Sequence, residues 1–271
     1  MHIRAGYAIA FYCATPTQIL LQLNVHPSRE RDLVTPDVVT SMPNVPVQSY
    51  IDLFGNKVTR VDAPAGEITF TNDFVIRDSG LLDETPDDAP LTPVKDLPND
   101  TLLYLLPSRY CDSDTLSDFA WSQFNGISGG TRLVQAICNF AHNRIRFDYK
   151  LANPQRMASD GLREGVGVCR DYAHLAVTLC RAMNVPARYC TGYLGDIGVP
   201  PDPAPMDFSA WFEVFLNGRW YTFDARHNHP RIGRVVMARG RDAADVALST
   251  AFGSAPLLRF EVTTYEEALA A

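Results

Sequence analysis

Residues 78–100 divide this chain into two parts that must bury separate cores. The segment contains seven acidic residues and four prolines: Asp78, Asp83, Glu84, Asp87, Asp88, Asp96, Asp100, Pro86, Pro90, Pro93 and Pro98. Proline lacks an N–H donor and charged side chains bury little surface, so helix and sheet are both disfavoured here. The segment is either a flexible tether or an ordered loop packed on one domain. We expect a domain boundary here, with residues 1–77 before the segment and residues 101–271 after it.

The bulk properties exclude several classes of partner. The chain has 271 residues and a formal net charge of −7, which argues against nucleic acid or an anionic membrane as the main partner. Its first apolar run, Tyr7–Ala14, ends at Thr15-Pro16 and is too short to span a bilayer or act as a signal sequence. We therefore expect a cytoplasmic protein. Its oligomeric state stays open.

The six cysteines show no pairing or ligand pattern. None belongs to a CxxC pair, and their spacing matches no metal site. In a reducing compartment they should be free thiols. We expect no metal and no cofactor.

Residues 1–77 have the composition of an antiparallel β domain. Short runs of β-branched and aromatic residues are separated by Pro, Gly and Asn, at residues 7–14, 19–25, 45–54, 57–63 and 67–77. The sequence Phe54-Gly55-Asn56-Lys57 predicts a hairpin turn between two of them. We find no cluster of chemically reactive groups in this part.

Residues 101–271 predict helices first and an antiparallel sheet second. Apolar residues at helical spacing predict helices at 114–124, 131–143 and 169–183. Strand patterns follow at 187–193, 207–216, 219–225, 232–238 and 257–264, and Asn217-Gly218 is a strong two-residue hairpin signal. The fold class is therefore α+β, with an N-terminal antiparallel β domain before a core of helices packed on an antiparallel sheet.

The chemistry centres on Gly165–Met183, where Cys169 stands at the start of a predicted helix. Backbone N–H groups in the first turn of a helix have no intrahelical partner. These groups and the helix dipole favour a negative charge, so we expect a lowered thiol pKa and a thiolate nucleophile. The alternative is a buried cysteine that only fills space.

The order of Cys169, the strand SAWFEVF and the strand WYTFD resembles the transglutaminase-like superfamily of papain-like enzymes. The resemblance covers roughly residues 130–227 and includes GVCRDYAHL, RAMNVPARYCTGYL and GRWYTFDARHN. It extends to bacterial members of the cysteine protease type, which carry a β domain before this core. In the family a cysteine opens a helix, a histidine lies in an HAW-like strand and an aspartate ends the next strand. The resemblance thus implies that Cys169 is the nucleophile and Asp224 the orienting acid.

The family histidine is replaced, because HAW is Ser209-Ala210-Trp211 in this chain. A serine hydroxyl does not ionise usefully at neutral pH, so Ser209 cannot be the general base. With Asn217-Gly218 as the turn, partners across the hairpin sum to 435. Trp211 then faces Asp224, and Ser209 faces Arg226. All four side chains share one face, where Trp211 could wall an acyl-binding slot and Arg226 could bind Asp224 or a substrate carboxylate.

Three other histidines are candidates for the missing base. His227 points to the opposite face if the strand continues, whereas a loop before Pro230 could return His229 to the site. His174 lies five residues after Cys169, and a helix turns its side chain about 140° away from the thiol. We therefore interpret His174 as a core histidine first and a catalytic partner second. A metal site formed by Cys169, His174 and the 227/229 pair would need unusual spacing.

Two hypotheses for the function follow. The first is a thiol hydrolase or acyl transferase that acts on a peptide or amide bond through Cys169. The second is a protein that keeps the fold without turnover and binds a peptide or protein partner in the same cleft. A redox-sensing thiol is a weaker third reading.

Overall fold

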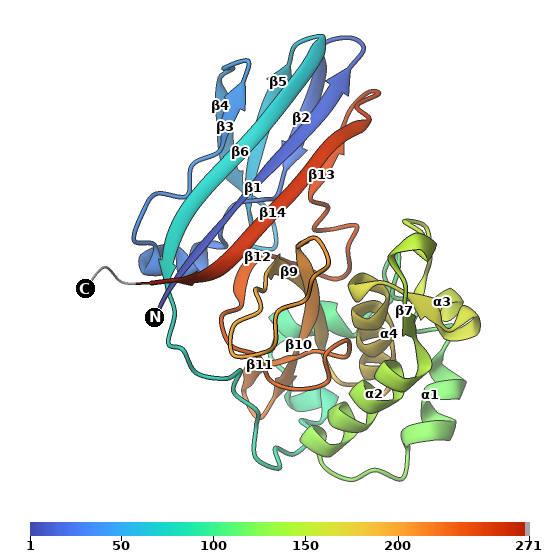
Figure 1. Cartoon of the computed structure of the whole chain (residues 1–271). Helices are drawn as coiled ribbons and strands as arrows, with labels where there is room; N and C mark the ends of the chain where they lie inside the picture. Colours follow the sequence, from blue (N-terminus) through green and yellow to red (C-terminus); the bar gives the residue numbers. More distant parts are fainter. Residues whose placement is uncertain (269–271) are drawn as a thin grey trace.

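Two four-stranded antiparallel sheets pack face to face and form the β domain (Figure 1). The first has the order β14 (Leu257–Glu267), β1 (His2–Cys13), β6 (Gly66–Arg77) and β3 (Thr40–Met42). The second has the order β13 (Ser249–Ala251), β2 (Thr17–Leu21), β5 (Lys57–Ala63) and β4 (Val47–Ile51). Alternate side chains of both sheets fill one apolar core, as the pleat of a strand requires. The structure describes residues 1–268 as a computed structural model.

The last strands of the chain return to the β domain, which corrects the sequence-based assignment of residues 257–264 to the C-terminal sheet. β14 pairs antiparallel with β1 from His2↔Glu267 to Phe11↔Leu257, and β13 pairs with β2. β1 has β6 on its other side, so without β14 its backbone groups would form an open edge. The β domain therefore combines residues from both ends of the chain, and a division at residue 101 separates strands that share a sheet.

The core domain contains a third antiparallel sheet, beside a group of helices. Its strand order is β11 (Arg219–Phe223), β10 (Ser209–Leu216), β9 (Ala187–Tyr193) and β12 (Val235–Gly240). The β10–β11 hairpin turns at Asn217-Gly218, and its partners run from Leu216↔Arg219 to Phe212↔Phe223. The predicted register, in which partners sum to 435, is correct throughout this ladder. The ladder stops at Phe223, before the pairs predicted for Asp224 and Arg226.

Four α-helices cover one side of this sheet (Figure 1). They are α1 (Ser117–Phe124), α2 (Gly130–Arg144), α3 (Ala158–Glu164) and α4 (Cys169–Ala182). α4 is central, because it packs on β9 and β10 and against the other three helices. A short parallel pair, β7 (Arg146–Phe147) and β8 (Val166–Gly167), leads the chain into α4. Within residues 1–268 no helix has both the length and the apolar character needed to cross a membrane.

The acidic segment 78–100 is an ordered connection that packs on the core domain. Leu82 pairs with Ile232 in an isolated β-bridge, and the Asp83 carboxylate accepts a hydrogen bond from Arg234 at 2.7 Å. Ala89 is buried against the helical core. Of the two sequence-based alternatives, the structure therefore has the ordered loop.

Gly192 in β9 is a position where the sheet leaves no room for a side chain. A Cβ atom there would lie 2.1 Å from the Val235 carbonyl oxygen and 2.8 Å from the Trp211 ring. We expect Gly192→Ala to lower the free energy of unfolding by about 1–3 kcal/mol, the usual cost of overpacking. Gly126→Ala is the control, since a Cβ at Gly126 meets nothing within 4 Å. Urea unfolding followed by circular dichroism measures both, and equal midpoints would contradict the close packing.

Candidate active site

Cys169 is the first residue of α4, and its position is set by a tight turn before the helix. The Asp171 carboxylate accepts a hydrogen bond from the Val168 N–H at 2.8 Å and one from the buried Arg156 at 3.2 Å. It therefore caps the helix start that carries the cysteine. Gly167 lets this side chain approach, because a Cβ at Gly167 would lie 2.6 Å from the Asp171 side chain.

The Cys169 thiol is buried, and this reverses the expected direction of its pKa. Burial raises the pKa to about 11. The charge of Arg226 lowers it, the carboxylate of Asp207 raises it, and hydrogen bonds from the Ala210 and Arg170 N–H groups lower it. The prediction of a lowered pKa from the helix start alone is therefore wrong. Desolvation of the thiolate outweighs the helix dipole, so the resting group is a neutral thiol.

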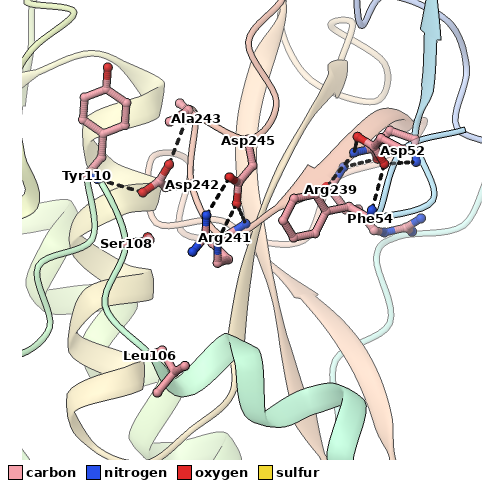
Figure 2. Close-up of polar contacts among 12 residues, drawn as sticks. Asp52, Phe54, Leu106, Ser108, Tyr110, Arg239, Arg241, Asp242, Ala243 and Asp245 are labelled. Atoms are coloured by element: carbon pink, nitrogen blue, oxygen red, sulfur yellow. Dashed lines mark hydrogen bonds and ion pairs between the residues drawn. The ribbon is translucent and has the colours of Figure 1, made fainter.

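A cavity of about 470 Å³ opens at the thiol. Tyr110, Asn153 and Tyr189 line it together with residues 243 and 246–249, which follow β12. Figure 2 shows how this segment is held: the Asp242 carboxylate accepts a hydrogen bond from the Tyr110 N–H at 2.7 Å, and Asp245 binds Arg241. The wall is thus fixed by buried and half-buried carboxylates.

The start of β10 separates this cavity from a smaller one. Asp207, Phe208 and Ser209 line both, and the second cavity, of about 90 Å³, also contains Arg226 and His227. Ser209 is 5 % exposed, and its hydroxyl has no hydrogen-bond partner within residues 1–268. A short polar side chain therefore lies between the thiol cavity and His227.

Asp224 lies at the end of β11 and holds His227 instead of facing a strand partner. Its Oδ2 is 2.8 Å from His227 Nδ1, and its Oδ1 accepts the N–H groups of Arg226 and His227. Burial alone would raise the pKa of the Asp224 carboxyl. The charge of Arg234 and the contacts with His227 outweigh burial, so the pKa lies below its usual range. The carboxylate is therefore ionised and oriented toward an imidazole.

The other predicted site residues lie apart from the thiol cavity or contribute only charge. Trp211 is buried beneath the Arg234 guanidinium and does not line the Cys169 cavity. His174 is stacked on Tyr110 and accepts the Ala243 N–H through Nε2, and burial lowers its pKa well below the usual value. It is a neutral core histidine.

Arg226 and His229 extend from the turn after Asp224. The guanidinium of Arg226 lies 4.1 Å from the centre of the Phe147 ring, close enough to the thiol to influence its pKa. His229 is exposed, and its Nδ1 is within hydrogen-bond distance of the His227 carbonyl oxygen. Among residues 1–268 no three His, Cys, Asp or Glu side chains converge as metal ligands would, so the metal hypothesis has no geometric support there.

Sequence reasoning missed Asp207 and the Ala210 N–H group. Asp207 stands two residues before the position of the family histidine, and burial raises its pKa. It belongs to the loop between β9 and β10. The Ala210 N–H carries no side-chain signal, and only the path of β10 past the helix start places it at the sulfur.

A family model matches the central part of this chain. The model described as the transglutaminase-like superfamily core matches residues 118–225. This range contains α4, Cys169 and the β10–β11 hairpin up to Asp224. Residues 118–225 therefore carry a transglutaminase-like core.

Three relatives match the chain over different lengths. The crystal structure of a "putative cysteine protease" from Cytophaga hutchinsonii is 29 % identical, with a TM-score of 0.84 over 100 % of this chain and 92 % of that one. An uncharacterised protein of Mycobacterium leprae is 25 % identical over 230 residues, 81 % of each chain. An uncharacterised protein of Mycobacterium tuberculosis is 32 % identical over 127 residues, which cover 42 % of this chain and 40 % of that protein. The likeness to the Cytophaga protein includes the β domain.

Two neighbouring charges should move the Cys169 pKa in opposite directions. Asp207→Asn removes a carboxylate that disfavours the thiolate, so alkylation of Cys169 by iodoacetamide at pH 8.5 should become roughly threefold to tenfold faster. Arg226→Gln removes a cation that favours the thiolate and should slow it by a similar factor. Mass spectrometry assigns the alkylated residue.

Asp62→Asn, an exposed substitution in β5, is the control and should leave the rate unchanged. Equal rates in all three variants would show that neither charge acts on the thiol.

Proposed function

We propose that the protein is a thiol hydrolase or acyl transferase that acts on an amide bond of a peptide or protein, with Cys169 as the nucleophile. One observation carries the proposal: Cys169 opens a helix and faces the large cavity, with the Arg170 and Ala210 N–H groups directed to its sulfur. The other five cysteines are at most 1 % exposed. Cys169 is thus the thiol that a substrate can reach.

The chemistry follows from this arrangement. The sulfur attacks the carbonyl carbon, the electron pair of the C=O bond moves to oxygen, and backbone N–H groups at the helix start stabilise the oxyanion. Expulsion of the amine leaves a thioester on Cys169. Water then gives hydrolysis, and a second amine gives transfer.

The cavity walls fit a peptide-like substrate. Tyr110 and Tyr189 provide aromatic surface, and Asn153, Thr191 and Ser249 provide polar groups. An apolar surface with a few placed polar groups is typical of sites that bind organic substrates. The candidate protease character of the Cytophaga protein supports the same substrate class.

The alternative is a protein that binds a peptide or protein partner in this cavity without turnover. It is favoured by Ser209 at the position of the family histidine and by the raised thiol pKa. Both features slow nucleophilic attack by a cysteine thiol when no other group accepts its proton.

Cys169→Ala tests the proposal directly. We expect a burst of p-nitrophenolate from p-nitrophenyl acetate in the wild type, and at least a thousandfold slower acylation in the variant, since the nucleophile is absent. Incorporation of monodansylcadaverine into casein measures transfer, and release of casein fragments measures hydrolysis.

The matched control is Cys13→Ala, which removes a buried thiol of the β domain and should keep the burst. Equal acylation in Cys169→Ala and wild type would overturn the proposed nucleophile. Acylation by the ester without turnover of any amide would favour the binding protein.

A further inference from the structure

The proposed reaction needs a proton acceptor that the family strand does not supply here. With a pKa of about 11, the Cys169 thiol is neutral at physiological pH, so it must lose its proton as it attacks. Ser209 occupies the position of the family histidine and cannot take a proton at that pH. A base must therefore come from another element.

The turn after β11 brings one histidine back toward the site. β11 ends at Phe223, the Asn228 N–H donates to the Asp224 carbonyl oxygen at 2.8 Å, and Asn228 has a φ of +57°. This turn reverses the direction that an extended strand would give His227. Its imidazole folds back over Asp224, with Nδ1 2.8 Å from Oδ2.

The aspartate determines which nitrogen of His227 is free. Asp224 is buried and ionised, so it only accepts hydrogen bonds, and Nδ1 must carry the proton that it donates. Arg234 binds the same Oδ2 at 2.8 Å and is itself bound to Asp83, which fixes the carboxylate. In the neutral imidazole, Nε2 is then the nitrogen that can accept a proton.

Ser209 lies between the cavity of this imidazole and the cavity of the thiol. It lines both, and its buried hydroxyl has no partner among the described residues. A serine is also a smaller barrier between the two cavities than a histidine would be. Arg226, adjacent to His227, already acts on the thiol through its charge.

We propose that His227, oriented by Asp224, is the general base of this protein and takes the place of the family's strand histidine. The proposal rests on the proposed function, because it assigns a role in the reaction of Cys169. The Sγ–H bond breaks as an Nε2–H bond forms, and Sγ bonds to the carbonyl carbon. The proton then passes from Nε2 to the leaving amine, and in the second half Nε2 takes a proton from water or an amine and returns it to the thiolate.

The other candidate bases fit less well. His174 is enclosed between Tyr110 and Tyr189 with Nε2 already bound, and His229 is exposed outside both cavities. Asp207 lies beside the thiol, but its carboxylate raises the pKa of the thiol that it would have to deprotonate. The charged and titratable groups that share the His227 cavity are Tyr149, Asp196, Asp202, Asp207, Arg226 and Arg231.

The test moves the histidine from position 227 to position 209. The rate of acylation of the full chain by p-nitrophenyl acetate is measured between pH 6.5 and 9. His227→Gln should slow acylation at pH 7 by about 10²- to 10⁴-fold, the usual contribution of a general base. The loss should shrink toward pH 9, because the thiol then begins to ionise without help. The double variant Ser209→His/His227→Gln should recover most of the rate, since it returns an imidazole to the strand position that borders the thiol cavity.

The outcomes separate the two proposals. If Cys169→Ala abolishes the burst while His227→Gln keeps the wild-type rate and pH profile, the nucleophile stands and the assignment of His227 fails. If Asp207→Asn, rather than His227→Gln, removes the burst, Asp207 is the base. Urea midpoints within error of the wild type exclude misfolding as the cause, and a double variant with a native midpoint but no recovery would contradict the shared role of the two positions.

Discussion

The buried ion pair between Arg234 and Asp224 connects the parts of the chain that build the site. Arg234 leads into β12, Asp224 follows β11, and the second partner of Arg234 is Asp83 in the acidic segment. Separating such a pair by removing one partner leaves an uncompensated buried charge, which typically costs about 3–5 kcal/mol. The segment 78–100 is therefore part of the support of the site, and four of its seven acidic residues form ion pairs with arginines.

A second constraint is the opposition of burial and polarity at Cys169. The helix start, Arg226 and two backbone N–H groups favour the thiolate, yet burial and Asp207 raise the pKa of the thiol. A cysteine that is ionised at rest would be reactive toward any oxidant or electrophile that enters the cavity. A neutral thiol with a separate base restricts its reactivity to the moment when a substrate is bound. The raised pKa is thus compatible with catalysis provided that a base lies within reach.

Local patterns predicted most of the fold and the place of Cys169 at the start of a helix. The Asn217-Gly218 turn fixed the hairpin register, and apolar spacing located α1, α2 and α4 within a few residues. The predicted register could not extend past Phe223. The Asp224 carboxylate accepts hydrogen bonds from the Arg226 and His227 N–H groups, and this ends the strand. The position of His227 depends on these hydrogen bonds. A rule based on strand alternation places its side chain on the opposite face.

The pairing of β14 with β1 could not be predicted from the sequence, for a different reason. Its partners are 246 to 265 residues apart, and no local pattern distinguishes a strand that closes the first sheet from one that extends the third. This pairing also affects the site, because the chain must cross from β12 to β13 to return to the β domain. Residues 243 and 246–249, which make this crossing, form a wall of the Cys169 cavity.

The β domain also holds the start of that crossing in place. The Asn56 side chain bonds both the N–H and the carbonyl oxygen of Arg239 at 2.8 Å. Asn56 belongs to the β4–β5 turn, so a loop of the β domain fixes the end of β12 from which the cavity wall departs. The shape of the Cys169 cavity is therefore a property of both domains. A core domain cut free at residue 101 would keep Cys169, Asp224 and His227 but lose the restraint on one side of the pocket that they serve.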